Sequence, residues 1–277
     1  MEWMLGALKE LAERFKPRIV RNVRKEIERS PLDYPTLFDH VFERFYSKTD
    51  SEGRWHDPYH IAYSTLFAVK LVCAGEAPPL VIPATSLHDI GYHSLLVDKE
   101  NWSSKNSRII HMQEGSGMAA EMLLGFYGIT EKDFGAIVGM VASHDNGYLG
   151  IPTTDANRLA LRDADRAWVM HPLSFYKDWV SKLRKGENLS LLDLFHSRLT
   201  SFYGLGESYP QEWGRTEKPD KEDAIQSPPS TKLAKEWRNR QFAACFDEIQ
   251  NNISSDAKTF RETIERHIRA ELSAGRG

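Results

Sequence analysis

Residues Ser86–His93 read SLHDIGYH, and the interpretation of the whole chain starts from this stretch. The pair His88-Asp89 stands at the end of an apolar run and is followed by Gly91. A buried His beside a buried Asp is costly unless the two are hydrogen-bonded or bind a cation. Imidazole nitrogen and carboxylate oxygen together suit divalent ions such as zinc, iron and manganese. The pair is therefore a candidate metal site, and the alternative is a His at a helix end with an Asp that caps the turn.

The same dipeptide occurs twice more, and three copies exceed what a chain with 10 histidines predicts by composition. His56-Asp57 is followed by Pro58, which disfavours a helix through that point. His144-Asp145 is followed by an Asn-Gly turn signal. Only His88-Asp89 follows a segment with a buried, apolar character.

Helical periodicity dominates the chain and predicts an all-α fold. Near the N-terminus, Leu8, Leu11, Phe15 and Ile19 recur at helical spacing, and Pro17 predicts a kink or break. The apolar segment 78–91 fits a strand or a buried helix, and its helical neighbours favour a helix. Further helices are predicted at 35–46, from 59, at 107–128, from 130 to 145, at 154–169, at 171–183, at 190–204 and twice within 231–277.

The chain has 277 residues, 41% of them hydrophobic and 27% charged, with a net charge of −3, as in ordinary soluble globular proteins. This balance argues against a general nucleic-acid-binding or anionic-membrane surface. We expect one all-α domain over 1–277, with a core at about 54–170, a loop or flap at 205–230 and closing helices at 231–277. The loop prediction rests on Pro, Gly and charged residues without periodicity.

Cys73 and Cys245 lie far apart and form no CxxC motif, so neither a disulfide framework nor a zinc ribbon is predicted. A reducing, cytoplasmic location is the expectation. The first 20 residues predict an amphipathic helix instead of a signal peptide, and no apolar run is long enough to cross a bilayer.

Several candidate ligands share a consistent order along the chain: His60, then His88-Asp89, then Asp165. This order resembles the HD superfamily of metal-dependent phosphohydrolases, an all-α fold named for its H…HD…D pattern. The resemblance covers residues 54 to 170 approximately. It rests on the segments RWHDPYHIAYSTLFAV, TSLHDIGYH, IIHMQEGSGMAAEMLLG, IVGMVASHDNGY and RDADRAW.

The resemblance implies one or two divalent ions per chain, drawn from manganese, iron, magnesium, nickel and zinc. Asp89 would bridge two ions where both sites fill, and His56 would donate a proton to the leaving group. The implied metal ligands are His60, His88, Asp89, Asp165 and, as in the binuclear branches, His111 and His144. Taken singly, His111 and His144 also fit hydrogen-bonded histidines at helix ends.

The implied activity is hydrolysis of a small phosphorylated metabolite or nucleotide. Many HD hydrolases carry a Lys just after the HD motif, where this chain has Tyr92. The candidates for binding the substrate phosphate are then Tyr92 itself and three basic residues, Arg54, Lys99 and Lys105. The signature of cyclic-dinucleotide-specific members is absent.

Two other activities fit the same residues. The superfamily includes diiron oxygenases with the ligand order His, His-Asp, His, His, Asp, which this chain also matches. A non-catalytic domain that senses a ligand is the second alternative. The sequence leaves the oligomeric state open.

Overall fold

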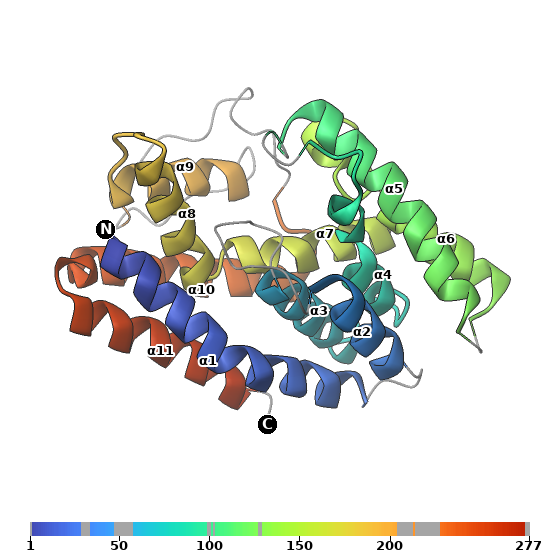
Figure 1. Ribbon diagram of the computed structural model, residues 1–277, viewed down its shortest axis with the longest axis horizontal. Coiled ribbons are helices and arrows are strands. Elements are labelled where there is room, and N and C mark those ends of the chain that lie inside the picture. The colour runs from blue at the N-terminus through green and yellow to red at the C-terminus, as the bar shows by residue number, and fades with distance from the viewer. Residues whose placement is uncertain are drawn as a thin grey trace. The chain divides into compact units, whose positions relative to one another are not determined.

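The computed structural model describes residues 2–28, 34–46, 58–98, 101, 103–126, 129–203, 213 and 228–274. Within these residues the chain forms helices and turns and no strands, which confirms the predicted all-α class (Figure 1). The α-helices are α1 (Glu2–Ile27), α2 (Pro35–Val41), α3 (Pro58–Cys73), α4 (Val81–Leu87), α5 (Lys105–Leu124), α6 (Glu131–Val141), α7 (Ala156–Val169), α8 (Pro172–Arg184), α9 (Leu191–Phe202), α10 (Lys232–Gln250) and α11 (Ala257–Ala274).

Short helical turns accompany these helices in the described part of the chain. A π-helical turn, η1 (Phe42–Tyr46), continues α2. Three 3₁₀ turns follow, η2 (Ile90–His93), η3 (Asn146–Leu149) and η5 (Ile253–Ser255). The turns η2 and η3 each begin one residue after a His-Asp pair, so both pairs lie where the chain leaves a helix.

The chain divides into two compact units, residues 20–166 and residues 1–19 with 167–277. Both α1 and α7 run continuously through a point of division. The domain organisation expected from the sequence therefore stays a prediction.

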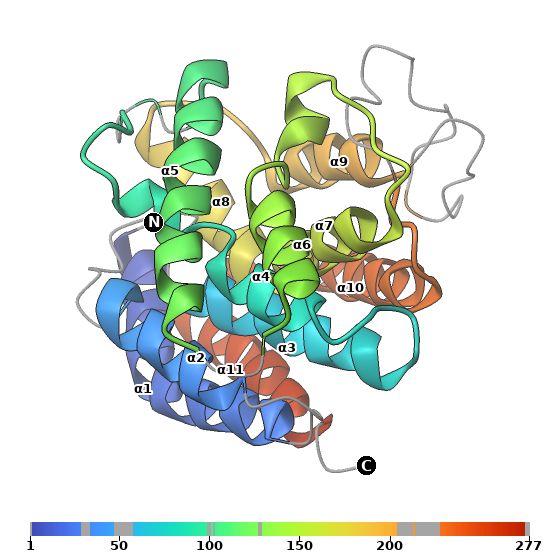
Figure 2. The same ribbon diagram turned by 90° about the vertical axis from the view of Figure 1, so that its right-hand side faces the viewer.

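The unit of residues 20–166 is built around α3, whose residues 58–69 are all buried. A helix that is apolar around most of its circumference belongs in a protein core. In this unit α3 packs on α4, α4 packs on α6, and α5 lies against both α6 and η2 (Figure 2). All six predicted metal ligands belong to this unit.

The second unit has its own aromatic core. Phe195 of α9 and Phe242 of α10 pack with their ring centroids 5.6 Å apart, and Trp213 lies 6.0 Å from Phe195. Trp213 is buried and its carbonyl oxygen contacts His196 Nε2 at 3.1 Å. It falls inside the predicted flap at 205–230, of which residues 205–212 and 214–227 lie outside the described part of the chain.

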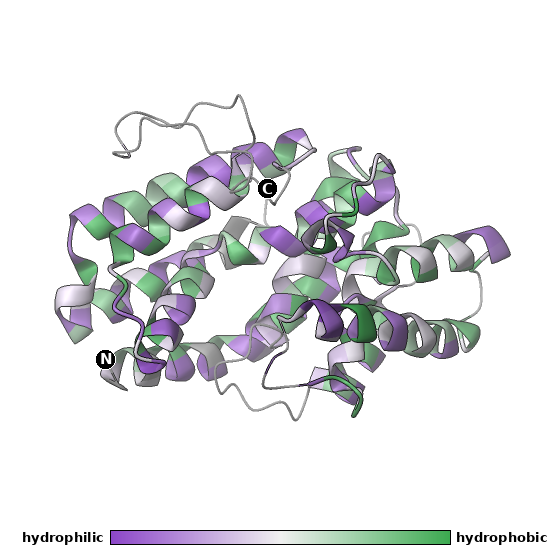
Figure 3. Ribbon diagram, turned by 90° about the horizontal axis from the view of Figure 1, so that it is seen from above, coloured by the Kyte–Doolittle hydropathy of each residue, from purple (hydrophilic) through white to green (hydrophobic). Residues whose placement is uncertain are grey.

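Most of the helices carry both hydrophilic and hydrophobic residues, as Figure 3 shows. In α11, Phe260, Ile264 and Ile268 are fully buried, in agreement with their spacing of four residues. No helix among the described residues is both long and apolar enough to cross a membrane.

Several predicted helices differ from the structure in their bounds or continuity, and three of them are informative. The helix α1 continues through Pro17 without a break. The helix α5 ends at Leu124, because the N–H of Gly125 already bonds back to the carbonyl of Met122. The helix predicted at 35–46 changes from α to π geometry at Phe42, and its Phe45 and Tyr46 pack against the ring of His93.

Candidate metal centre

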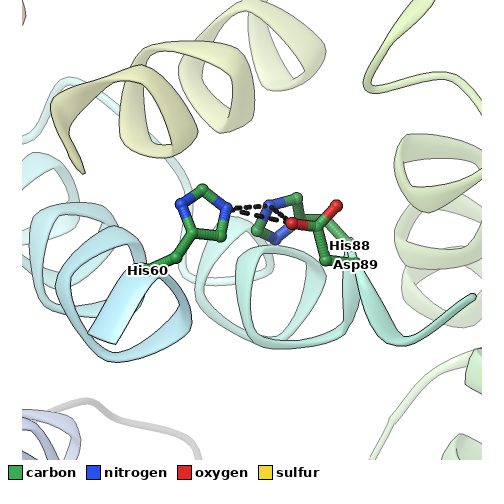
Figure 4. A group of neighbouring side chains, drawn as sticks. All are labelled: His60, His88 and Asp89. Carbon is green, nitrogen blue, oxygen red and sulfur yellow. Dashed lines mark hydrogen bonds and ion pairs between the residues drawn. The ribbon is translucent and has the colours of Figure 1, made fainter. Parts of the chain in front are cut away.

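His60, His88 and Asp89 converge in the interior of the 20–166 unit. His60 comes from the first turn of α3, and the other two follow the last turn of α4 (Figure 4). The Nε2 atoms of His60 and His88 are 3.0 Å apart, and Asp89 Oδ2 lies 3.0 Å and 3.1 Å from them. Asp165 Oδ1 of α7 adds contacts of 3.2 Å and 3.5 Å to the same two nitrogen atoms. These four residues are called the first half of the centre.

A second group, called the second half, forms on the other oxygen of the same carboxylate. His111 of α5 and His144, which follows α6, have their Nε2 atoms 3.0 Å apart. Asp89 Oδ1 lies 3.4 Å from His144 Nε2 and 3.9 Å from His111 Nε2. Each half holds three buried residues whose ligand atoms are close enough to share one ion. Asp89 therefore faces two histidine pairs, with one oxygen toward each.

Three of the rings are oriented by the backbone of their own helices. Nδ1 lies 2.6 Å from the carbonyl oxygen of Thr85 in His88, and 2.8 Å from that of Val141 in His144. In His111 it lies 3.3 Å from the carbonyl of Ser107. A carbonyl only accepts hydrogen bonds, so each Nδ1 carries a proton and each ring turns its Nε2 inward.

This arrangement fits a cation. In each half, two Nε2 atoms 3.0 Å apart face each other and a carboxylate, all of them buried. Acceptor atoms so close together repel one another unless a proton or a metal ion lies between them. The set of imidazole nitrogen and carboxylate oxygen is the one that binds zinc and other divalent transition metals.

The electrostatics favour positive charge at the same place. Burial opposes protonation of His60, yet its hydrogen bonds with Asp165 and Asp89 raise its pKa to about 9. The pKa of His88 is also raised, despite burial, by the charge of Asp89 and the hydrogen bond with Asp165. Burial alone would raise the pKa of Asp165, but hydrogen bonds with His60 and His88 lower it. Two carboxylates thus hold an excess of negative potential that a cation would neutralise.

Two glycines set the distance between the two halves. A methyl group on Gly91 of η2 would lie 1.9 Å from the carbonyl oxygen of His111 and 2.6 Å from the amide nitrogen of Gly115. Backbone therefore touches backbone where η2 crosses α5. This close approach brings Asp89, just before η2, to His111 on α5. Gly115 also permits the close approach, because a methyl group there would lie 3.3 Å from the amide nitrogen of Gly91.

Of the predicted substrate-binding residues, Tyr92 lies beside the centre. Its ring stacks on His111, with centroids 4.0 Å apart and planes 11° from parallel. Burial and the charge of Asp89 raise the pKa of Tyr92, so its phenol stays protonated. Lys105 is exposed in the first turn of α5. Arg54, Lys99 and the predicted proton donor His56 lie outside the described residues.

Sequence reasoning missed a basic residue beside the second half. Arg108 Nη1 lies 2.5 Å from Asp145 Oδ2, and the same oxygen lies 3.7 Å from His111 Nε2. Asp145, which precedes an Asn-Gly turn signal in the sequence, stands directly before η3, and its side chain is buried beside the centre. Arg108 precedes His111 by three residues, a spacing that places two side chains on one helix face. That spacing was the available signal.

Asp163 is also buried, but it is not among the residues whose ligand atoms converge. It pairs with Arg162 at 3.2 Å.

Comparison of the chain with protein-family models, with curated proteins and with solved structures gave no significant match.

Proposed function

We propose that this chain is a metal-dependent phosphohydrolase of the HD type. The observation that carries the proposal is that Asp89 presents its two oxygens to two buried histidine pairs. The motifs that resemble the HD superfamily support it, because their six ligand positions are the residues that converge. The substrate would be a small phosphorylated metabolite or nucleotide.

A bound divalent ion would lower the pKa of a coordinated water molecule and polarise a phosphoryl oxygen. The residues that would hold such ions are His60, His88, Asp89 and Asp165 in the first half, and His111, His144 and Asp89 in the second. Tyr92, stacked on His111, fixes the plane of that ring and keeps water off its face. Five of the six side chains are buried and that of Asp165 is partly buried, which limits competing solvent around the reacting group.

His56 is proposed to protonate the leaving oxygen. Replacing His56 by Gln should lower turnover of an alkyl phosphate by about 10² to 10⁴. Metal content should stay unchanged, because His56 is not among the proposed ligands. Hydrolysis of p-nitrophenyl phosphate should be relatively spared, since its weakly basic leaving group needs less protonation.

Steady-state kinetics on both substrates, with metal analysis of each preparation, checks this prediction. His40→Gln, an exposed histidine of α2, is the matched control and should change neither quantity. Loss of metal in His56→Gln would make His56 a ligand. An unaltered rate on the alkyl phosphate would remove it from the reaction.

The proposed function itself is tested on protein purified without chelators. Metal identity and stoichiometry are measured first, and release of inorganic phosphate is then assayed over a panel of nucleotides and sugar phosphates. Phosphate release that disappears with chelator and returns with one added metal would support the proposal. Bound metal without hydrolysis of any panel member would count against it and favour a ligand-sensing role.

A diiron oxygenase is the second candidate, because the same six residues supply the ligand order that such members use. Aerobic and anaerobic assays discriminate the two. Two irons per chain and product formation only in the presence of oxygen would favour the oxygenase.

A further inference from the structure

The two halves of the centre differ in the carboxylates available to them. The first half has Asp165 in addition to Asp89, with Oδ1 3.2 Å and 3.5 Å from its two Nε2 atoms. In the second half the additional carboxylate is Asp145, whose Oδ2 lies 3.7 Å from His111 Nε2. Asp145 is therefore the counterpart of Asp165: each is a further carboxylate close to a histidine of its own half.

The difference is that Asp145 is already paired. Its Oδ2, the oxygen nearest to His111, is also the oxygen that Arg108 Nη1 contacts at 2.5 Å. An ion bound by this oxygen would have to share it with a guanidinium, which is a cation itself. In the described part of the chain, the carboxylate of Asp165 pairs instead with His60 and His88.

Arg108 is held firmly in this position. Its guanidinium carbon lies 3.9 Å from the ring centroid of Tyr148, and its Nε donates to the carbonyl oxygen of Ser103 at 3.2 Å. A guanidinium that stacks on an aromatic ring and forms a charge-assisted hydrogen bond keeps its orientation. Arg108 and Asp145 are both largely buried, so their charges are weakly screened by salt.

We infer that Asp145 is the fourth ligand of the second half, and that Arg108, by pairing with it, weakens the binding of a second ion there. The inference rests on the proposed function in one respect, the metal-binding role of the histidines. It predicts sequential loading, with a tight ion in the first half and a weak one in the second. Arg108 is a positioning residue in this account, because it acts through Asp145.

The test uses Mn²⁺ alone and needs no substrate. Chelator-stripped full-length protein is titrated with Mn²⁺, and the EPR signal of unbound Mn²⁺ reports the number and affinity of the sites. Wild-type protein should show one tight and one weaker site. Arg108→Met should strengthen the weaker site by about 10- to 100-fold, the range by which groups next to a ligand change metal affinity. The tight site should be unchanged.

A second substitution separates ligation from simple repulsion. In Arg108→Met combined with Asp145→Asn, the gain should disappear, because the freed ligand is gone. If the gain persisted in the double variant, or if Arg108→Met gave no gain, the inference would be wrong. Arg162→Met is the matched control, since it removes another largely buried arginine that pairs with an aspartate, and should leave the second site unchanged.

Folding is followed by circular dichroism. If Arg108→Met does not fold, Arg108→Gln removes the charge and keeps a polar side chain, and the same outcomes apply to it. A tight first site with an unaltered second site would refute the inference alone. Absence of any Mn²⁺ binding by the wild-type protein would instead refute the metal centre of the proposed function.

Discussion

Replacing Asp89 by Ala is expected to abolish metal retention while the helices stay folded. Asp89 is the residue whose two oxygens reach both halves of the centre, 3.0 Å from His60 Nε2 and 3.4 Å from His144 Nε2. Groups that merely support a ligand are worth about 10- to 100-fold in metal affinity, so loss of the shared ligand should cost more than about 100-fold. Metal content after gel filtration, together with far-ultraviolet circular dichroism, checks the prediction.

Asp163→Asn is the matched control for Asp89→Ala. Asp163 is buried in the same unit and also pairs with a basic side chain, that of Arg162, but it lies outside the centre. This variant should lose some stability, because a buried guanidinium loses its ionised partner. It should keep its metal. Full metal occupancy in Asp89→Ala would contradict the proposed centre.

Gly91→Ala is expected to destabilise the protein strongly, although it adds a single methyl group. That methyl would lie 1.9 Å from the carbonyl oxygen of His111 and 2.6 Å from the nitrogen of Gly115. Both atoms belong to the backbone of α5, so a side-chain rotation cannot relieve the clash and η2 must move away. We expect a loss of about 3 kcal/mol in the free energy of unfolding, at the upper end for overpacking. Urea denaturation measures it.

The helix α5 contains a glycine for which the opposite effect on stability is expected. Gly117 is exposed in α5, and a methyl group there would meet nothing within 4 Å. Gly117→Ala should therefore stabilise the protein by about 1 kcal/mol, the difference in helix propensity. Should Gly91→Ala be as stable as wild type, η2 would not pack on α5 as closely as described.

The class of the fold followed from the sequence because the helices are amphipathic. Phe260, Ile264 and Ile268 repeat every fourth residue and are all fully buried. The points at which helices end or break were harder to predict from the sequence. Pro17 lacks an N–H and predicts a break, yet α1 continues, since its apolar residues on either side, such as Phe15 and Ile19, are buried. Tertiary packing thus outweighed a local preference.

The pair His88-Asp89 stood next to a recognisable local signal, and the resemblance to the HD superfamily implied the other ligands. Asp89 followed an apolar run, and His144 preceded a turn. The pairing of Arg108 with Asp145 had no such signal, because it joins residues 37 positions apart on α5 and before η3. Only the packing of α5 on α6 brings them together. Contacts of this kind depend on tertiary structure and leave little trace in one sequence.

The hydrogen bonds from Nδ1 of His88 and His144 end on carbonyl groups of the last turns of α4 and α6. The carboxyl end of a helix carries a partial negative charge, the sum of its aligned peptide dipoles. Each imidazole therefore links the negative end of a helix to the centre. The hydrogen bond at Nδ1 makes the inward Nε2 atom more electron-rich. Any cation bound between the rings would be stabilised by the main chain of two helices as well as by Asp89, and only replacement of His88 or His144 themselves would break these links.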